Sequence, residues 1–227
     1  DGMEKFFEKD KIILTGNPVR QGLLNAHITK EEAVASFGLD PNKKTILIVG
    51  GSLGARTLNQ CMIAGLGKIK ASDVQFIWQT GKIYFEQAKT AVAKAGDLPM
   101  LYVMDFISKM EDAYSAADLV ISRAGAGSIS EFCLLSKPVV LVPSPNVAED
   151  HQTKNALALV EKDAALYVKD SEANEKLLDV AMETVHKEDI LKGLSANIAK
   201  LAHVDSANII AEEVYKLAEK YKKGHGY

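Results

Sequence analysis

The chain has 227 residues, of which 47% are hydrophobic and 25% are charged. This length and composition allow one sizeable α/β core beneath an ordinary polar surface. The formal net charge of -3 argues against a nucleic-acid partner, which would require a strongly basic face. No apolar run approaches the roughly 20 residues of a membrane-spanning helix, so we expect this chain itself to be soluble.

The two cysteines, Cys61 and Cys133, are too few for a disulfide framework and are typical of a reducing compartment. Each falls among apolar neighbours in a predicted helix, so we expect buried thiols rather than a catalytic cysteine. The N-terminus, Asp1–Lys5, does not begin with Met and lacks the apolar region of a signal peptide. It indicates a boundary within a longer protein.

Short β-rich runs alternate with helical patterns along most of the chain. Strands are predicted at 11–14, 44–49, 74–79, 100–103, 118–122, 138–142 and 165–168. Helices are predicted at 29–37, 54–67, 83–95, 108–116, 128–136 and 151–162. The central strands are continuous apolar runs, as in parallel strands that are covered on both faces. The alternation predicts a Rossmann-like α/β fold, with an open, mostly parallel sheet and helices on both of its faces.

Two predicted helices begin with a capping box, in which Ser or Thr is followed three residues later by Glu: Thr29–Glu32 and Ser128–Glu131. From about residue 171 the pattern is purely helical. We therefore expect residues 1–170 to form the ligand-binding domain, and residues 171–227 to form helices packed on it. One apolar face of the last helix, near 205–222, is formed by Ile209, Ile210, Val214, Leu217 and Tyr221.

Ligands of open α/β sheets bind at the carboxyl ends of the strands, so the loops after strands are the first candidates for a site. Gly50–Ala55 follows the strand at 44–49, and its glycines permit a sharp turn close to a ligand. Ser52 adds a hydroxyl group, and the next helix presents N–H groups to an anion. The glycine spacing matches neither the dinucleotide fingerprint nor the P-loop. A tight turn that binds nothing remains the alternative.

A second loop of small residues, Ser122–Gly127, also leads from a strand into a helix and suits a phosphate group. Glu131 in that helix has two interpretations. Its carboxylate either bonds back to the backbone of Ser128 as a helix cap, or accepts hydrogen bonds from the two hydroxyl groups of a ribose. The spacing alone does not decide between them.

The third loop, 143–155, contains two prolines that end a strand and a polar cluster that opens a helix. Gln152 and Asn155 are three residues apart, so they share a helix face and can present amide groups to sugar hydroxyls. The adjacent residues 149–151 include two acids and a histidine, but they point in different directions and do not predict a metal site. A solvated helix start is the alternative.

Thr15–Arg20 follows the first predicted strand, with Gly16 and Pro18 specifying a turn. Arg20 is either a contact to phosphate or base, or a surface cation. Together the loops bring two glycine-lined helix starts, an arginine, a carboxylate and an amide pair to one sheet edge. That combination fits a nucleoside diphosphate that carries a sugar, although neither the base nor the sugar follows from it.

These same segments resemble the successive motifs of the MurG family of glycosyltransferases. They occur in the family's order and at similar intervals: Gly16–Arg20, Gly50–Ala55, Arg123–Glu131 and Asp150–Leu157. The resemblance implies the C-terminal, donor-binding half of a two-domain GT-B enzyme that works in peptidoglycan synthesis. Such an enzyme transfers N-acetylglucosamine, with inversion, from UDP-N-acetylglucosamine to undecaprenyl-pyrophosphoryl-MurNAc-pentapeptide. It also implies a peripheral enzyme on the cytoplasmic side of the bacterial inner membrane.

The resemblance further implies which residues touch the donor. Arg20 and Ser52 approach it, Ser52 at the diphosphate, and the main chain at Ile107 recognises uracil. Glu131 binds the ribose hydroxyls and Gln152 the sugar. The other implied contacts to phosphates and ribose are Ala126, Gly127, Ser128, Ile129 and Ser130. No catalytic residue, metal or cofactor is implied within this chain.

Two positions depart from the family pattern: Gly127 stands where many relatives carry a larger residue, and His151 where some carry Gln. The acceptor domain, which in the family carries the general base, the acceptor contacts and the membrane patch, is missing from this sequence. We therefore expect the chain to bind donor without transferring it. A UDP-sugar epimerase and a non-catalytic sugar-nucleotide-binding module on the same scaffold stay open, whereas a nicotinamide dehydrogenase fails at both glycine loops.

Overall fold

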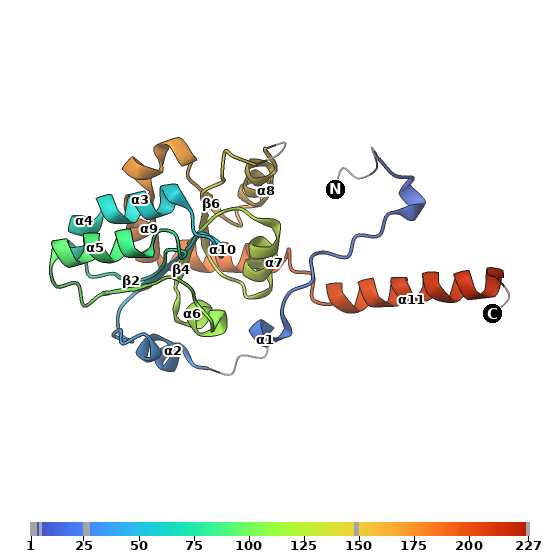
Figure 1. Cartoon of the computed structure of the whole chain (residues 1–227), viewed down its shortest axis with the longest axis horizontal. Coiled ribbons are helices and arrows are strands. Elements are labelled where there is room, and N and C mark those ends of the chain that lie inside the picture. Colours follow the sequence, from blue (N-terminus) through green and yellow to red (C-terminus); the bar gives the residue numbers. More distant parts are fainter. Residues whose placement is uncertain (1–3, 5, 25–27, 148–149, 226–227) are drawn as a thin grey trace.

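The structure, a computed structural model, describes residues 4, 6–24, 28–147 and 150–225 (Figure 1). It contains one six-stranded sheet of order β3-β2-β1-β4-β5-β6, in which every neighbouring pair is parallel. The strands are β1 (Thr45–Val49), β2 (Gln75–Gln79), β3 (Leu101–Met104), β4 (Leu119–Ser122), β5 (Val139–Leu141) and β6 (Leu166–Tyr167). The predicted Rossmann-like α/β fold is confirmed.

The apolar strands divide the interior into two cores, one on each face of the sheet. All five residues of β1 are buried. Leu47 and Val49 contribute to one core and Ile46 and Ile48 to the other, because successive side chains of a strand point to opposite faces. A strand that must be apolar on both faces is recognisable as an uninterrupted hydrophobic run.

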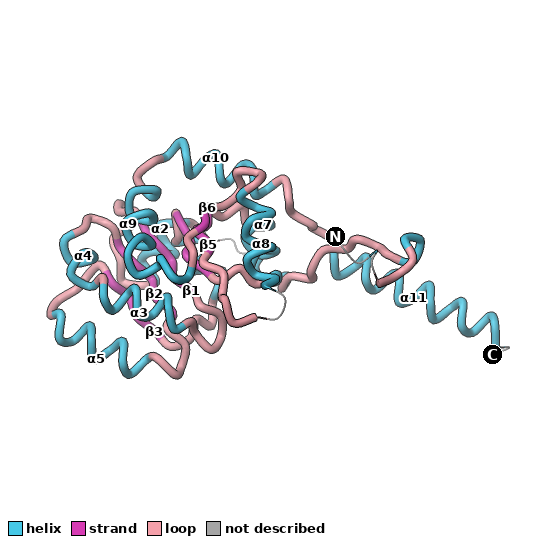
Figure 2. The backbone as a smooth tube through the Cα atoms, turned by 90° about the horizontal axis from the view of Figure 1, so that it is seen from above, coloured by secondary structure: helices cyan, strands magenta, loops and turns pink. Residues whose placement is uncertain are grey.

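Helices cover both faces of the sheet, as Figures 1 and 2 show. Side chains in the first core come from α2 (Lys30–Ser36), α6 (Met110–Ala116), α7 (Ala126–Leu134) and α8 (His151–Val160). Those in the second come from α3 (Arg56–Ala64), α4 (Leu66–Ala71), α5 (Phe85–Ala95) and α9 (Ala173–Val185). Helix α10 (Glu188–Ala199) contributes Ile198 to the first core and Leu191 to the second. The described residues also form three short helical segments: η2 (Lys9–Lys11), which has no buried residue and lies in the N-terminal segment away from the sheet, α1 (Gln21–Leu24) and η4 (Asp170–Glu172).

One of the two predicted capping boxes is present. At the start of α2, the Thr29 side chain accepts a hydrogen bond from the Glu32 N–H and the Thr29 N–H donates to the Glu32 carboxylate. The box predicted at Ser128–Glu131 is wrong, because α7 already begins at Ala126 after an extended Gly125. Ser128 therefore lies inside the first turn, and the Glu131 carboxylate accepts a hydrogen bond from another helix instead.

Two further predictions differ from the structure. The helix predicted at 54–67 is divided at Gly65 into α3 and α4; a Cβ atom on Gly65 would lie 2.0 Å from a Leu178 methyl group of α9. The strand predicted at 11–14 is wrong. Residues 12–14 have no ladder partner among the described residues, and the Ile13 and Leu14 side chains are 53% and 68% exposed. A short apolar run forms a strand only where a sheet edge is available to pair with it.

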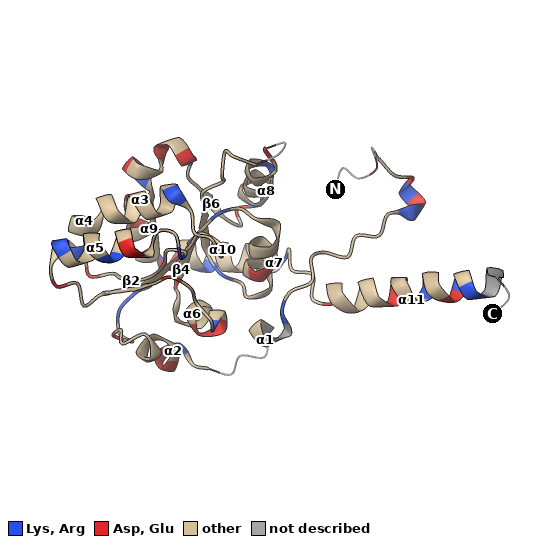
Figure 3. Cartoon of the chain, viewed as in Figure 1, with Lys and Arg blue, Asp and Glu red and all other residues tan. Residues whose placement is uncertain are grey.

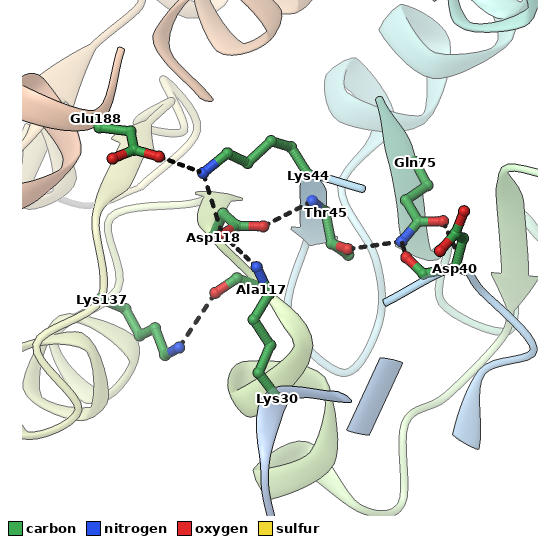
Figure 4. A network of polar contacts seen from close by, with 9 residues as sticks. All are labelled: Lys30, Asp40, Lys44, Thr45, Gln75, Ala117, Asp118, Lys137 and Glu188. Atoms are coloured by element: carbon green, nitrogen blue, oxygen red, sulfur yellow. Dashed lines mark hydrogen bonds and ion pairs between the residues drawn. The ribbon is translucent and has the colours of Figure 1, made fainter. Parts of the chain in front are cut away.

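A polar network ties together the amino ends of the central strands (Figure 4). The Asp118 carboxylate accepts hydrogen bonds from the Thr45 N–H at 2.8 Å and from Lys30 Nζ at 2.6 Å. Gln75 Nε2 donates to the Thr45 hydroxyl at 3.0 Å and to the Asp40 carbonyl at 2.7 Å. This edge of the sheet is thus closed by the protein's own groups, and the carboxyl edge is the one that can receive a ligand.

The last helix, α11 (Ser206–His225), extends away from the rest of the molecule (Figures 1 and 2). Val214 and Leu217 on its predicted apolar face are 60% and 67% exposed, and its second half carries both acidic and basic side chains (Figure 3). This differs from the expectation that all the C-terminal helices pack on the domain. None of the described helices combines the length and the apolar character that crossing a bilayer requires.

Candidate functional site

The sheet reverses its strand order between β1 and β4, which are neighbours although they are far apart in the chain. Such a switch point leaves a crevice at the carboxyl ends of the two strands. The loops that leave these strands are Gly50–Gly54 and Arg123–Gly125, the two glycine loops selected from the sequence. Two adjoining cavities open here, with volumes of about 590 and 330 Å³, and both are lined by Gly51 and Ser128.

The larger cavity lies over the glycine loops and the starts of α3 and α7. Arg123 reaches across its floor, where its guanidinium donates to the carbonyls of Val142 and Pro143 and to the Asp170 carboxylate. The Thr57 hydroxyl donates to the other Asp170 oxygen at 3.1 Å. The remaining lining residues are Gly50, Gly51, Gly54, Ala55, Arg56, Tyr84, Ser122, Gly125, Ser128, Ser144, Pro145, Asn146 and Gln152.

The predicted amide pair is divided by the structure. Gln152 lines the larger cavity, and its Oε1 accepts a hydrogen bond from the Ser144 N–H at 2.9 Å, which leaves the NH₂ group as its donor to a ligand. Asn155 instead donates from Nδ2 to the Ala124 carbonyl at 3.1 Å and is not among the lining residues of either cavity. Asn155 therefore supports the loop after β4, while Gln152 faces the space above it.

The smaller cavity has an apolar wall and a charged rim. Phe106, which lines this cavity, is about half exposed, and the neighbouring Ile107 is buried. A flat heterocycle could pack on this wall while bonding to main-chain groups of the loop after β3. The other lining residues are Arg20, Val49, Gly51, Ser52, Gln79, Met110, Tyr114, Ser128 and Glu131.

Glu131 lies on the wall of this smaller cavity and is held by two groups. The Tyr114 hydroxyl donates to its Oε2 at 2.7 Å, and Arg20 Nη2 lies 3.7 Å from its Oε1. Burial, followed by the nearby Glu131 carboxylate, raises the pKa of Tyr114 far above its ordinary value. The tyrosine is therefore a permanent donor, and Glu131 an acceptor that keeps lone pairs for a ligand.

The glycine loop after β1 is fixed by its neighbours. Gly54 has φ +79°, and a Cβ atom there would lie 1.9 Å from the Thr80 carbonyl oxygen. Gln79 Nε2 donates to the Gly51 carbonyl at 3.0 Å and to the Asp105 carbonyl at 3.2 Å, so one side chain at the end of β2 links the loops that follow β1 and β3. The loop is pre-organised, which lowers the entropy cost of binding.

Six of the ten predicted site residues line the two cavities: Arg20, Ser52, Ile107, Ser128, Glu131 and Gln152. Ala126 and Gly127 lie in the first turn of α7, where both are exposed, and they line neither cavity. Ile129 and Ser130 line a separate hollow on the other side of α7, since successive residues of a helix point about 100° apart. There the Ser130 hydroxyl donates to the Ala126 carbonyl and accepts from Asn17 Nδ2.

Several lining residues were not selected from the sequence. Gln79 and Asp170 lie at or after the ends of β2 and β6, so the rule that ligands bind beyond strand ends would have found them. Thr57 lies in the first turn of α3, where side chains next to a helix start can reach an anion. Tyr114 sits in the middle of α6 and carries no local signal.

The cysteines and the side chains that commonly bind metals are spread over the described part of the chain. Over the part of the chain that the structure describes, no three His, Cys, Asp or Glu side chains are grouped so as to hold a metal ion. Cys61 and Cys133 are buried, and burial raises the pKa of each thiol to about 11. The prediction of buried thiols is confirmed, and neither sulfur has the thiolate character of a nucleophile.

Comparison with known families decides among the scaffolds that share this topology. The model of the glycosyltransferase family 28 C-terminal domain matches residues 45–212, which include both glycine loops and every strand of the sheet. The chain belongs to this family. It covers the family 28 domain together with the segment of residues 1–44 that precedes it and the end of α11.

Curated relatives extend over the whole chain. A protein of Phocaeicola vulgatus named UDP-N-acetylglucosamine--N-acetylmuramyl-(pentapeptide) pyrophosphoryl-undecaprenol N-acetylglucosamine transferase is 75% identical over 226 residues, which are 100% of this chain and 60% of the relative. A protein of Porphyromonas gingivalis with the same name is 49% identical over 98% of this chain and 59% of its own length. The chain thus spans about three fifths of the relatives it matches.

Solved structures agree with this family assignment. The crystal structure of Acinetobacter baumannii MurG is 28% identical and superposes with a TM-score of 0.69 over 86% of this chain and 55% of that one. A Staphylococcus aureus MnaA–UDP structure superposes at 0.66 over 95% of this chain and 57% of that one, but with 13% identity. That second likeness shows the fold alone. The resemblance to the MurG family is confirmed.

Proposed function

We propose that this chain is the donor-binding part of an inverting N-acetylglucosaminyltransferase of peptidoglycan synthesis. The observation that carries the proposal is the pair of joined cavities at the switch point, one lined by glycine loops and helix starts, the other by an apolar wall and a carboxylate. A nucleoside diphosphate sugar has this same division into a charged, hydroxyl-rich end and a flat base with a ribose. The names of the relatives supply the sugar and the acceptor.

UDP-N-acetylglucosamine would lie across both cavities. The diphosphate would sit over Gly51 and Ser128, the residues common to the two, where the N–H groups at the starts of α3 and α7 favour negative charge. Uracil would pack beside Phe106 and bond to the main chain at Ile107. The ribose hydroxyls would donate to Glu131, and the sugar would reach Gln152 in the larger cavity.

The chain's own contribution to the reaction would be electrostatic. When an acceptor hydroxyl attacks the anomeric carbon, negative charge grows on the departing diphosphate. N–H groups that are already oriented toward that charge stabilise the transition state more than the ground state. The general base, the lipid-linked muramyl-pentapeptide acceptor and the contact with the inner membrane would be supplied by the part of the relatives that this chain does not cover.

The first test is a titration of the chain with UDP, UDP-N-acetylglucosamine, UDP-glucose and NAD by calorimetry. We expect the uridine nucleotides to bind and NAD not to bind.

Glu131→Ala removes hydrogen bonds to a charged group, which are worth about 1.5–3 kcal/mol, so UDP should bind about 10- to 150-fold more weakly. Glu219→Ala, an exposed position on α11, is the matched control and should leave the affinity unchanged. Equal UDP affinity in both variants would count against the site.

A second test addresses the reaction. The chain alone should bind the donor but not transfer the sugar to lipid-linked muramyl-pentapeptide, whereas a protein of the relatives' full length should transfer it. Robust transfer by the chain alone would refute the division of labour. Conversion of UDP-N-acetylglucosamine to another UDP-sugar without any acceptor would favour the epimerase alternative.

A further inference from the structure

Tyr114 is a buried tyrosine whose hydroxyl group touches the candidate nucleotide site. Its side chain is 3% exposed, and its ring packs edge-on against Phe132, with centroids 5.9 Å apart and an interplanar angle of 86°. The ring is thereby fixed between α6 and the core, so the position of its hydroxyl is fixed as well. The one hydrogen bond that this hydroxyl makes among the described residues is the 2.7 Å bond to Glu131 Oε2.

The other neighbour of Glu131 is a poor anchor. Arg20 lies 3.7 Å from Oε1, beyond ordinary hydrogen-bond distance, and its side chain is 64% exposed. An exposed arginine keeps many rotamers and is screened by solvent. The orientation of the carboxylate is therefore set by the buried Tyr114 hydroxyl at Oε2, and Oε1 of this cavity-lining side chain has only the distant Arg20 beside it among the described residues.

We propose that Tyr114 is a positioning residue for the nucleotide: it holds the Glu131 carboxylate in the orientation that accepts hydrogen bonds from the ribose hydroxyls. The inference rests on the proposed function, and it adds a residue that discriminates ribose from sugars without hydroxyls. A glutamate has three rotatable side-chain bonds, so a carboxylate held before binding loses less entropy when the ribose arrives.

The hydroxyl is suited to this role over the whole working range of pH. The raised pKa of Tyr114 keeps the proton on its oxygen, so the tyrosine donates and never competes as a second anion. An ammonium or guanidinium group in its place would pair with the carboxylate more strongly and compete with the ribose. A neutral donor orients Glu131 while leaving its negative charge available to the ligand.

The test is Tyr114→Phe, which removes one oxygen atom and keeps the packed ring. Affinity for UDP should fall about 5- to 10-fold, as expected for one lost neutral-to-charged hydrogen bond whose place water partly takes. The affinity of the variant for 2′,3′-dideoxyuridine diphosphate should stay within about twofold of the parent chain's affinity for the same ligand. That ligand has no ribose hydroxyl that could donate a hydrogen bond to Glu131. A purely structural defect would weaken both ligands equally, and the thermal midpoint is recorded for each variant.

Two further variants complete the design. Tyr102→Phe is the matched control: its ring packs edge-on against Phe37, but it lies on β3 outside both cavities, and it should change neither affinity. Combined with Glu131→Gln, Tyr114→Phe should add less than about a twofold further loss, because the two residues act through one carboxylate.

The outcomes separate the two proposals. If the parent chain does not bind UDP, the proposed function fails and this inference falls with it. If the parent binds UDP and prefers it to the dideoxy ligand, but Tyr114→Phe keeps that preference, only the role of Tyr114 is overturned. Equal losses for both ligands in Tyr114→Phe would likewise overturn it.

Discussion

Lys137 is a partly buried lysine outside the two cavities of the candidate site, and its side chain opposes folding. It lies at the amino edge of the sheet, where its Nζ donates to the Ala117 carbonyl at 3.1 Å (Figure 4). Burial lowers its pKa to about 8; the nearby Asp118 opposes this shift and Lys30 adds to it. The folded protein therefore carries an ammonium group that is poorly solvated at neutral pH.

Replacing Lys137 by Met should stabilise the protein in a pH-dependent way. Below pH 8 the lysine is protonated in both the folded and the unfolded state, and folding bears the full cost of desolvating the ammonium group. Between about pH 8 and 10.5 the unfolded state binds more protons than the folded state. The free energy of unfolding of the parent chain therefore rises with pH over this range. Lys137→Met should thus raise the unfolding free energy by about 1–2 kcal/mol at pH 7, a figure reduced for partial exposure. The gain should vanish near pH 10.5. Urea unfolding at several pH values measures it, with exposed Lys94→Met as control; a pH-independent difference would contradict the prediction.

At the scale of single residues, sequence predicts the site where chemistry and strand ends coincide. Ser52, Ser128 and Gln152 all follow strands, and all three line the cavities. Glu131 could be selected from the sequence, but its partner could not. Tyr114 precedes it by 17 positions, on a different helix, and a tyrosine in an apolar helix pattern is indistinguishable from an ordinary core residue.

At the scale of elements, the loop between β1 and α3 depends on a close approach between backbones. Gly51 and Gly54 both have positive φ, +81° and +79°, but only at Gly54 would an added Cβ atom meet another chain segment. A Cβ atom at Gly51 would meet nothing within 4 Å, whereas one at Gly54 would lie 1.9 Å from the Thr80 oxygen. The pair therefore separates the cost of the backbone conformation from the cost of the contact.

We expect Gly54→Ala to lower the unfolding free energy by about 2–3 kcal/mol more than Gly51→Ala. Both alanines bear the penalty of the left-handed region, roughly 1–2 kcal/mol, and only the first must also displace the Thr80 loop. Chemical denaturation of the two variants measures the difference. Equal losses would show that the loop relaxes at no cost and is not held by this contact.

Element boundaries were predictable where local signals decide them and not where distant contacts do. The Thr29–Glu32 box fixes the start of α2 through neighbours in sequence. By contrast, the break at Gly65 accompanies the approach of Leu178 from α9, far along the chain, and no local pattern reports it. The run at 11–14 has the composition of a strand but no edge to join.

At the scale of the whole molecule, α11 is the part whose sequence and surroundings disagree. Ile210, Val214, Leu217 and Tyr221 recur at intervals of four, three and four residues, which is typical of a helix that packs along a partner. In this chain all four are exposed, by 37% to 67%. An amphipathic pattern predicts that a face will be covered but does not say by what. The relatives are longer, and we expect the rest of such a protein to cover this face.

Ending the chain after Val204 tests whether α11 contributes to the domain. From Ser206 to Lys222, only Ser206 is buried and only Ile209 and Glu213 are partly buried. Because so little of α11 packs on the domain, its removal should change the thermal midpoint of the remainder by no more than about 2 °C. UDP affinity should be unchanged, while the far-UV helical signal should fall. A drop of more than about 5 °C would mean that α11 folds back onto the domain in solution.

The paired substitutions Val214→Lys and Leu217→Lys give the converse test. They should leave the stability of this chain unchanged but destabilise a protein of the relatives' full length, where we expect other residues to pack on this apolar face.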